Sequence, residues 1–168
     1  MSAGSAPAGL GLQQILSGDV RARRCEALAM SFRHTTGFTV EFGDCDPAKI
    51  VFYPNFFRWM DSAARHYFAA AGVPSWHETE ATDGIIGAPL VDASAHFKRP
   101  ATYGDRIAVE TSISEWRGRT FVMKHVIRRG DDVLVEGKET RIFARRHPED
   151  PARIQAVEAP EHIRKRLE

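Results

Sequence analysis

One segment constrains the fold of this chain more than any other, because it has the pattern of a helix that is apolar nearly all round. It is YPNFFRWMDSAARHYFAAAG, residues 53–72. A proline stands near its start, where a missing backbone N–H costs nothing, and Gly72 stands where a helix-ending glycine belongs. Apolar side chains recur at helical spacing on one side, and Phe57, Trp59 and Ala63 fill the other. We therefore expect a long helix that is buried on every side.

Strand-like runs stand on both sides of this helix in the sequence. Residues 37–44 alternate before it, with Phe38, Val40 and Phe42 on one face. After an irregular segment, 73–89, four runs follow, 90–98, 106–115, 120–129 and 133–144, the last two joined by a turn at Gly130-Asp131-Asp132. One strand, one long helix and a series of antiparallel strands form an α+β pattern. A sheet wrapped around a single central helix, the hot-dog arrangement, would bury such a helix.

The two ends of the chain differ in composition from its centre. Residues 1–34 are rich in Gly, Ala and Ser and then basic, and they lack the early positive charge of a secretory signal. We assign them to a flexible N-terminal extension. Residues 35–160 form the single predicted domain, and residues 161–168 form a polar tail that we expect to end in a short exposed helix.

Charge and cysteine content argue against several classes of protein. The chain has 23 basic and 22 acidic side chains, so it offers no basic excess to nucleic acid. No apolar run approaches the roughly 18 residues of a membrane helix. Cys25 and Cys45 form neither a disulfide framework nor a metal motif, and no histidine stands at metal-ligand spacing. We expect a cytoplasmic protein with no metal and no cofactor.

The segment EFGDCDPAKIVFYPN, residues 41–55, carries the candidate chemistry. Asp46 stands seven residues before Tyr53, which opens the helix. The free N–H groups and dipole of a helix N-terminus form an anion site, which would stabilise the oxyanion of a bound acyl carbonyl. Asp46 would attack that carbonyl or activate a water. A purely structural role stays open, because Asp-Pro and Gly-Asp pairs are common in turns and Asp caps helices.

Three blocks of the sequence resemble the 4-hydroxybenzoyl-CoA thioesterase family. They are EFGDCDPAKIVFYPNFFRWMDSAARHYF, GIIGAPLVDASAHFKRPATYGD and EWRGRTFVMKH, and the likeness covers about residues 36–160. The resemblance implies a hot-dog fold, hydrolysis of an acyl-CoA thioester, and a homo-oligomer that is a dimer of dimers. It also implies that Asp46 is the catalytic carboxylate and that the Tyr53 N–H lies in the oxyanion hole.

The resemblance also assigns residues that bind the substrate. Asp61 would accept a hydrogen bond from the ring hydroxyl of the acyl group. By periodicity alone it is an exposed acid or a partner of Arg58 or Arg65. Arg117, Arg119 and Thr120 would hold the nucleotide phosphates of CoA, although two arginines in a turn are a weak signal by themselves.

One residue departs from the family pattern, and several functions stay open. Lys49 stands where family members usually carry a small residue, often glycine. The leading hypothesis is hydrolysis of 4-hydroxybenzoyl-CoA. The alternatives are a thioesterase for benzoyl-CoA, another hydroxybenzoyl-CoA or a short-chain acyl-CoA, and a non-catalytic module that binds acyl-CoA or an acyl carrier.

Overall fold

The computed structural model describes residues 32–168, so all but the last three residues of the predicted flexible extension, 1–34, lie outside it. No helix in the described part of the chain is long and apolar enough to cross a membrane. The elements are β1 (Arg33–Thr39), the 3-10 turn η1 (Phe42–Asp44), α2 (Pro54–Ala70), α3 (Trp76–Asp83), β2 (Leu90–Phe97), β3 (Arg106–Arg117), β4 (Thr120–Arg129), β5 (Asp132–Arg146), β6 (Ile154–Val157) and α4 (Glu161–Leu167).

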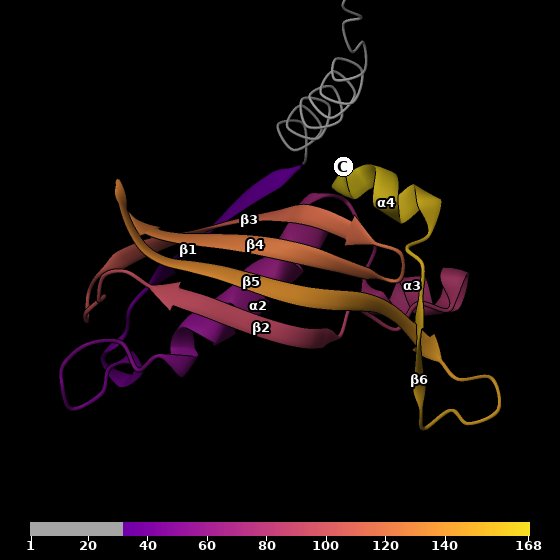
Figure 1. Cartoon of the computed structure of the whole chain (residues 1–168), viewed down its shortest axis with the longest axis horizontal. Helices are drawn as coiled ribbons and strands as arrows, with labels where there is room; N and C mark the ends of the chain where they lie inside the picture. Colours follow the sequence, from indigo (N-terminus) through magenta and orange to yellow (C-terminus); the bar gives the residue numbers. More distant parts are fainter. Residues whose placement is uncertain (1–31) are drawn as a thin grey trace, which may run out of the picture. The chain divides into compact units, whose positions relative to one another are not determined.

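The strands form one antiparallel sheet with α2 lying across one of its faces (Figure 1). The strand order is β1-β3-β4-β5-β2, and β6 pairs with the end of β5. Along β3 every second side chain points to the helix side, and Ile107, Val109, Thr111 and Ile113 are all buried, as their alternation predicted. The predicted α+β hot-dog fold, a sheet packed on one long helix, is confirmed.

The core divides into two hydrophobic clusters along α2. One contains Trp59 and Met60 with side chains of β3, β4 and β5 near the start of the helix. The other contains Tyr67 and Phe68 with the opposite ends of the same strands. A row of buried polar side chains, which we call the polar row, lies between the clusters: Thr111, His125, Glu139 and Arg141.

Two predictions near the N-terminal side of the domain are wrong. The strand begins at Arg33 and ends at Thr39, because the side chain of Asp44 accepts the backbone N–H of Glu41 and turns the chain into η1. Phe42 is therefore outside the strand and 81% exposed. The helix α2 is buried on one face only, and its polar residues Arg58, Asp61 and Arg65 are exposed in the single chain.

The irregular segment before β2 contains a helix that periodicity did not reveal. Ser75 and Glu78 form a reciprocal capping box at the start of α3, and Gly84 ends it in a left-handed conformation with φ 71°. The Ser-x-x-Glu spacing and the following glycine were visible signals for this helix.

The C-terminal tail belongs to the core. The expected short helix is present as α4, but its Ile163 and Leu167 side chains are fully buried in the second hydrophobic cluster. The buried Tyr67 hydroxyl donates a hydrogen bond to the Leu167 carbonyl at 3.0 Å. The helix is therefore half-buried and not simply exposed.

A glycine in the middle of β5 lets α2 approach the sheet closely. A Cβ at Gly137 would lie 2.1 Å from Sδ of Met60, whose side chain is fully buried. We expect Gly137→Ala to lower the free energy of unfolding by about 1–3 kcal/mol, because the core must shift to admit the methyl group. Chemical denaturation measures this loss. Gly37→Ala in β1 is the matched control, since nothing lies within 4 Å of its Cβ, and an equal loss there would contradict the explanation.

The departure at Lys49 coincides with unusual backbone geometry. Lys49 has φ 63°, the left-handed region, and it is the one described residue other than glycine with positive φ. This conformation costs a residue with a Cβ about 1–2 kcal/mol. The position thus requires what glycine provides, which explains why a small residue suits it.

We expect Lys49→Gly to raise the free energy of unfolding by about 0.5–1 kcal/mol, because relief of the strain exceeds the entropy that glycine loses on folding. Denaturation of the purified protein measures the change. Lys49→Ala is the control, since it removes the same charge and keeps the Cβ. A gain of the same size in Lys49→Ala would assign the effect to charge.

Candidate active site

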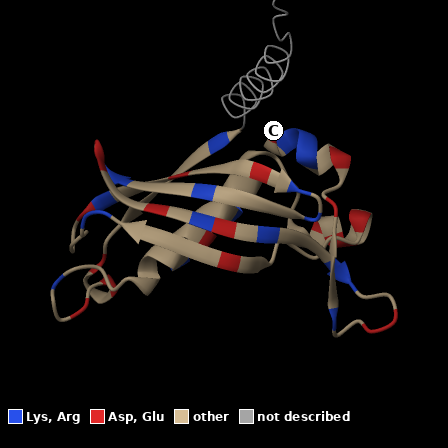
Figure 2. Ribbon diagram, viewed as in Figure 1, with Lys and Arg blue, Asp and Glu red and all other residues tan. Residues whose placement is uncertain are grey.

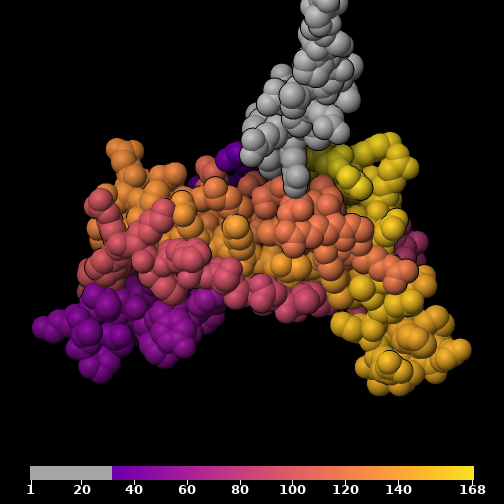
Figure 3. Space-filling model, viewed as in Figure 1, coloured from indigo at the N-terminus to yellow at the C-terminus, as the bar shows by residue number. Residues whose placement is uncertain are grey.

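The loop between η1 and α2 is a narrow turn that projects from one end of the domain (Figure 3). Cys45 and Val51 face each other across it in an isolated antiparallel bridge. The Asp46 N–H donates to the Ile50 carbonyl at 2.9 Å, and the Lys49 N–H donates to the Asp46 carbonyl at 2.8 Å. These bonds fix the backbone on both sides of Asp46 and therefore the position from which its side chain extends.

Asp44 has a structural role in this loop. Its carboxylate accepts the Glu41 N–H at 2.8 Å. Its carbonyl accepts the Phe52 N–H at 2.8 Å and the Asn55 side-chain amide at 2.9 Å. Both polar groups of Asp44 are therefore engaged in shaping the turn and joining it to the start of α2.

The Asp46 carboxylate uses one of its two oxygens within the turn. Its Oδ1 accepts the Ala48 N–H at 2.8 Å, a local turn bond that sets the direction of the side chain. Its second oxygen accepts no hydrogen bond from any residue between 32 and 168. The side chain of Asp46 is only partly buried. The Asp46 carboxylate is thus held in one direction, and its second oxygen is free to react.

The start of α2 leaves one backbone donor free. Pro54 has no N–H, and the N–H groups of Asn55 and Phe56 donate to the carbonyls of Phe52 and Tyr53 at 3.0 and 3.1 Å. Within the described chain the N–H of Tyr53 donates to no other group. At a helix N-terminus such an N–H, with the dipole behind it, favours a developing negative charge.

An open apolar hollow of about 290 Å³ lies beside this donor. Lys98 and Arg99 at its edge are paired with Glu136 and Asp132 at 2.8 Å each. The lining comes from the loop, the start of α2 and the segment after β2: Ile50, Val51, Tyr53, Phe56, Phe97, Lys98, Arg99, Pro100 and Ala101. Such a hollow suits the apolar part of a ligand.

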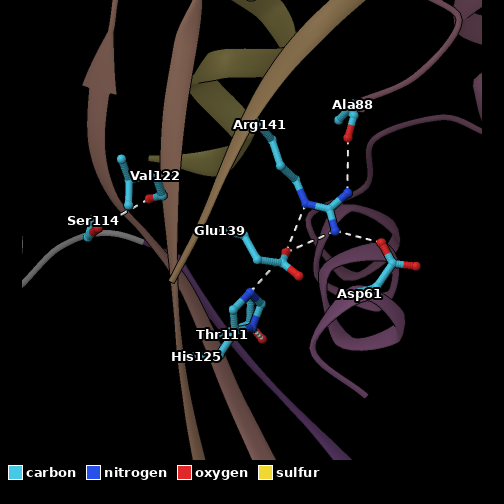
Figure 4. Close-up of polar contacts among 8 residues, drawn as sticks. All are labelled: Asp61, Ala88, Thr111, Ser114, Val122, His125, Glu139 and Arg141. Atoms are coloured by element: carbon cyan, nitrogen blue, oxygen red, sulfur yellow. Dashed lines mark hydrogen bonds and ion pairs between the residues drawn. The ribbon is translucent and has the colours of Figure 1, made fainter. Parts of the chain in front are cut away.

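Asp61 lies two turns further along α2, and its partner is neither Arg58 nor Arg65. The guanidinium of Arg141, on β5, donates to Asp61 Oδ1 at 2.6 Å (Figure 4). The periodicity of the helix suggested local partners and missed this one. The sequence of β5 did contain a sign of this contact. Two charged residues, Glu139 and Arg141, occupy positions that face the core, between the buried Val135 and Phe143, and so need partners there.

His125, on β4, also belongs to the polar row. It is fully buried, and its Nε2 lies 3.2 Å from Glu139 Oε2. Burial by itself would raise the pKa of the Glu139 carboxyl, but the hydrogen bond from His125 and the charge of Arg141 outweigh it and hold that pKa below its usual range.

The predicted phosphate-binding turn joins β3 to β4. Gly118 has φ 57° there, which explains the glycine between the two arginines. Arg117 is paired with Glu115 at 2.7 Å, and the Thr120 hydroxyl donates to the Arg117 carbonyl at 3.2 Å. The side chain of Arg119 is exposed and bonds to no other described residue.

A single chain does not bring this turn to Asp46. The first residue of β3 pairs with Thr39, at the end of the sheet that carries the loop of Asp46, and the turn follows the last residue of β3. Twelve residues of strand put the two ends on the order of 35 Å apart. Figure 2 shows basic residues at the β3–β4 turn, at the end of the sheet opposite the loop of Asp46, and others at the strand ends near that loop.

Within residues 32–168, no group of three His, Cys, Asp or Glu side chains is placed to hold a metal ion. The candidate chemistry therefore rests on carboxylates, backbone donors and arginines. Asp46 lies in the loop that leads into α2, Tyr53 stands directly before the first residue of that helix, and Asp61 follows on the same helix.

Comparison with known proteins identifies the family. A model of the thioesterase-like superfamily matches residues 40–167. A 4-hydroxybenzoyl-CoA thioesterase from Pseudomonas sp. (strain CBS-3) is 44% identical over 126 residues, which cover 72% of this chain and 87% of that protein.

Solved structures agree with the sequence match. A 4-hydroxybenzoyl-CoA thioesterase variant in complex with 4-hydroxybenzoyl-CoA superposes with a TM-score of 0.74 at 38% identity, covering 81% of this chain and 99% of that chain. A gentisyl-coenzyme A thioesterase has a TM-score of 0.65 at 31% identity, covering 80% and 98%. The chain therefore belongs to the thioesterase-like superfamily and, within it, to the 4-hydroxybenzoyl-CoA thioesterase family that its motifs resemble.

Proposed function

We propose that this chain hydrolyses 4-hydroxybenzoyl-CoA to 4-hydroxybenzoate and CoA, with Asp46 and the Tyr53 N–H as its catalytic groups. Thioester hydrolysis itself follows from membership of the family. The observation that carries the assignment of the site is the pairing at the start of α2. A carboxylate with an unused oxygen stands in the loop that leads to a backbone N–H with no partner in the described chain.

The reaction needs few groups because a thiolate leaves readily. Asp46 attacks the thioester carbon directly, so that the carbon–sulfur bond breaks, CoA departs as thiolate and water then hydrolyses the mixed anhydride. Alternatively, Asp46 takes a proton from a water that attacks the same carbon. In either route the carbonyl oxygen becomes negative, and the Tyr53 N–H with the α2 dipole stabilises it.

The substrate class rests on Asp61. A carboxylate on the helix face disfavours an acyl group that offers it no donor, whereas a ring hydroxyl satisfies it. The similar Pseudomonas protein is a 4-hydroxybenzoyl-CoA thioesterase, and the similar gentisyl-CoA thioesterase also acts on a hydroxylated ring. Another hydroxybenzoyl-CoA is accordingly the second candidate substrate.

We expect Asp46→Asn to lower kcat for 4-hydroxybenzoyl-CoA by at least about 10²-fold, because the amide neither attacks the carbonyl nor takes a proton. Release of free thiol from 4-hydroxybenzoyl, 3-hydroxybenzoyl, gentisyl, benzoyl, phenylacetyl and butyryl thioesters measures turnover. Asp44→Asn is the control in the same turn, since an amide oxygen still accepts the Glu41 N–H. Full activity in Asp46→Asn would leave a binding module as the function.

The two routes differ in where the oxygen of water goes. In a single turnover with excess enzyme in ¹⁸O-water, base catalysis places the label in the product and never in the Asp46 carboxylate. Direct attack places it in that carboxylate when water attacks the aspartyl carbon of the mixed anhydride. Label found by mass spectrometry in the peptide that contains Asp46 therefore shows direct attack.

An oligomer explains how the phosphate-binding turn serves the same site. The strand β2 lies at an edge of the sheet, where β5 is its only partner within residues 32–168, and it exposes the apolar side chains of Leu90, Val91 and Phe97. An edge of this kind pairs readily with another strand. Antiparallel pairing of two β2 strands about a two-fold axis would turn the second sheet end for end. The Arg117–Thr120 turn of one chain would then lie at the end that carries Asp46 in the other.

We expect a mass in solution of four times the 18.8 kDa of the chain, as for a dimer of dimers. Light scattering across a range of concentrations measures it. A fully active species with the mass of one chain would contradict a site shared between chains. The cytoplasmic location stays a prediction.

A further inference from the structure

The polar row crosses three neighbouring strands and ends at α2 (Figure 4). Thr111 Oγ1 on β3 lies 3.0 Å from His125 Nδ1 on β4. His125 Nε2 lies 3.2 Å from Glu139 Oε2 on β5, and Arg141 Nε donates to the same oxygen at 2.9 Å. The side chains of His125 and Glu139 are 0% and 1% exposed. These bonds form a continuous connection from the far side of the core to the helix.

Arg141 has a single orientation because all its nitrogens are engaged. Nε donates to Glu139, NH1 donates to the Ala88 carbonyl at 3.0 Å, and NH2 donates to Asp61 Oδ1 at 2.6 Å. The planar guanidinium therefore cannot turn without losing a bond in the protein interior. Its edge toward α2 acts as a rigid support for the Asp61 carboxylate.

Asp61 is the one member of this connection that reaches the surface. Its side chain is 67% exposed, against 8% for Arg141. Its Oδ1 is held by the guanidinium, and its Oδ2 accepts no hydrogen bond from any residue between 32 and 168 and points away from Arg141 in Figure 4. One oxygen thus orients the carboxylate, and the other is open to a ligand.

The hydrogen bonds also define which groups of the row carry the ionic contacts. A carboxylate accepts only, so His125 donates from Nε2 to Glu139, and its Nδ1 is bonded to the Thr111 hydroxyl. The Arg141 guanidinium lies between the Glu139 and Asp61 carboxylates, so the row ends in a carboxylate at the surface. That end attracts an uncharged O–H donor and repels an anion.

Stability alone does not account for this arrangement. Buried ion pairs contribute little compared with apolar side chains of the same volume, because both ions must leave water. The row also interrupts a core whose two hydrophobic clusters would otherwise be continuous. An exposed carboxylate such as that of Asp61 is well solvated by water and needs no buried partner. Its bond to the buried Arg141 therefore indicates that the direction of the carboxylate has a function.

We infer that Arg141, held in place by Glu139 and His125, is a positioning residue that aims the Asp61 carboxylate at an uncharged ring hydroxyl of the acyl group and so determines the preference for hydroxylated substrates. This inference rests on the proposed function, since it concerns the acyl end of the same site. Arg141 acts through Asp61 and does not itself touch the substrate.

A double-mutant cycle tests the inference. The quantity compared is the hydroxyl preference, defined as kcat/KM for 4-hydroxybenzoyl-CoA divided by kcat/KM for benzoyl-CoA. It is measured in wild type, Arg141→Gln, Asp61→Asn and the double variant. We expect Arg141→Gln to lower the preference about tenfold, through KM for the hydroxylated substrate, because a poorly aimed carboxylate loses much of a charge-assisted hydrogen bond. In the Asp61→Asn background we expect no further loss.

Arg146→Gln is the matched control, since Arg146 also lies on β5 and pairs with a helix carboxylate, Glu80 of α3, at 2.9 Å. It should leave the preference unchanged. Circular dichroism and thermal unfolding check that each variant folds. If Arg141→Gln does not fold because Glu139 is left charged and unpaired, Glu139→Gln combined with Arg141→Gln removes both charges, and the cycle is run from that variant.

The outcomes separate the two proposals. An unchanged preference in Arg141→Gln, or an equal loss with and without the Asp61 carboxylate, overturns the positioning role and leaves the proposed function intact. A wild type that cleaves thioesters without preferring the hydroxyl overturns both the positioning role and the proposed substrate. A wild type that cleaves no thioester overturns the proposed function itself and, with it, this inference.

Discussion

The packing of α2 against the sheet is the contact on which the rest of the site depends. Met60 lies over Gly137 in β5, where no side chain holds the helix away. The same helix carries Tyr53 at its start and Asp61 two turns later, about 12 Å along its axis. One rigid-body contact therefore places both the Tyr53 N–H and the Asp61 carboxylate, which we propose as the oxyanion donor and the hydroxyl acceptor. A shift of the helix on the sheet would move both groups together.

The polar row places a constraint on this packing. The two hydrophobic clusters hold α2 on the sheet, and the row between them determines its position along the strands, because Arg141 reaches Asp61 only in one register. Apolar contacts are tolerant of small slides, whereas a bond of 2.6 Å to an immobile guanidinium is not. Hydrophobic burial thus supplies the stability of the helix, and the ionic contact supplies its alignment.

Local patterns in the sequence predicted local structure well. Helical spacing and a terminal glycine placed α2 within two residues of its observed bounds, and alternation placed β3, β4 and β5. The pairing of Asp61 with Arg141 could not be predicted in this way. The two residues are 80 positions apart, and their contact depends on strand register and on the rotation of the helix. The left-handed backbone at Lys49 was equally hidden, because nothing in a lysine indicates its φ.

Three features of the single chain would be completed by a second copy of the chain. The loop of Asp46 and the turn at Arg117–Thr120 lie at opposite ends of the sheet, Asp61 lies on an exposed helix face, and one edge of β2 pairs with no strand of residues 32–168. A two-fold axis at that edge would pair β2 with the same strand of a second copy. Because it reverses the direction of the second sheet, it would also bring the Arg117–Thr120 turn of one chain to the Asp46 loop of the other. It would also bring a second copy alongside α2. An acyl ring held near Asp61 would then be enclosed by two chains, so that water is excluded and the hydrogen bond to its hydroxyl counts for more than it does in solvent.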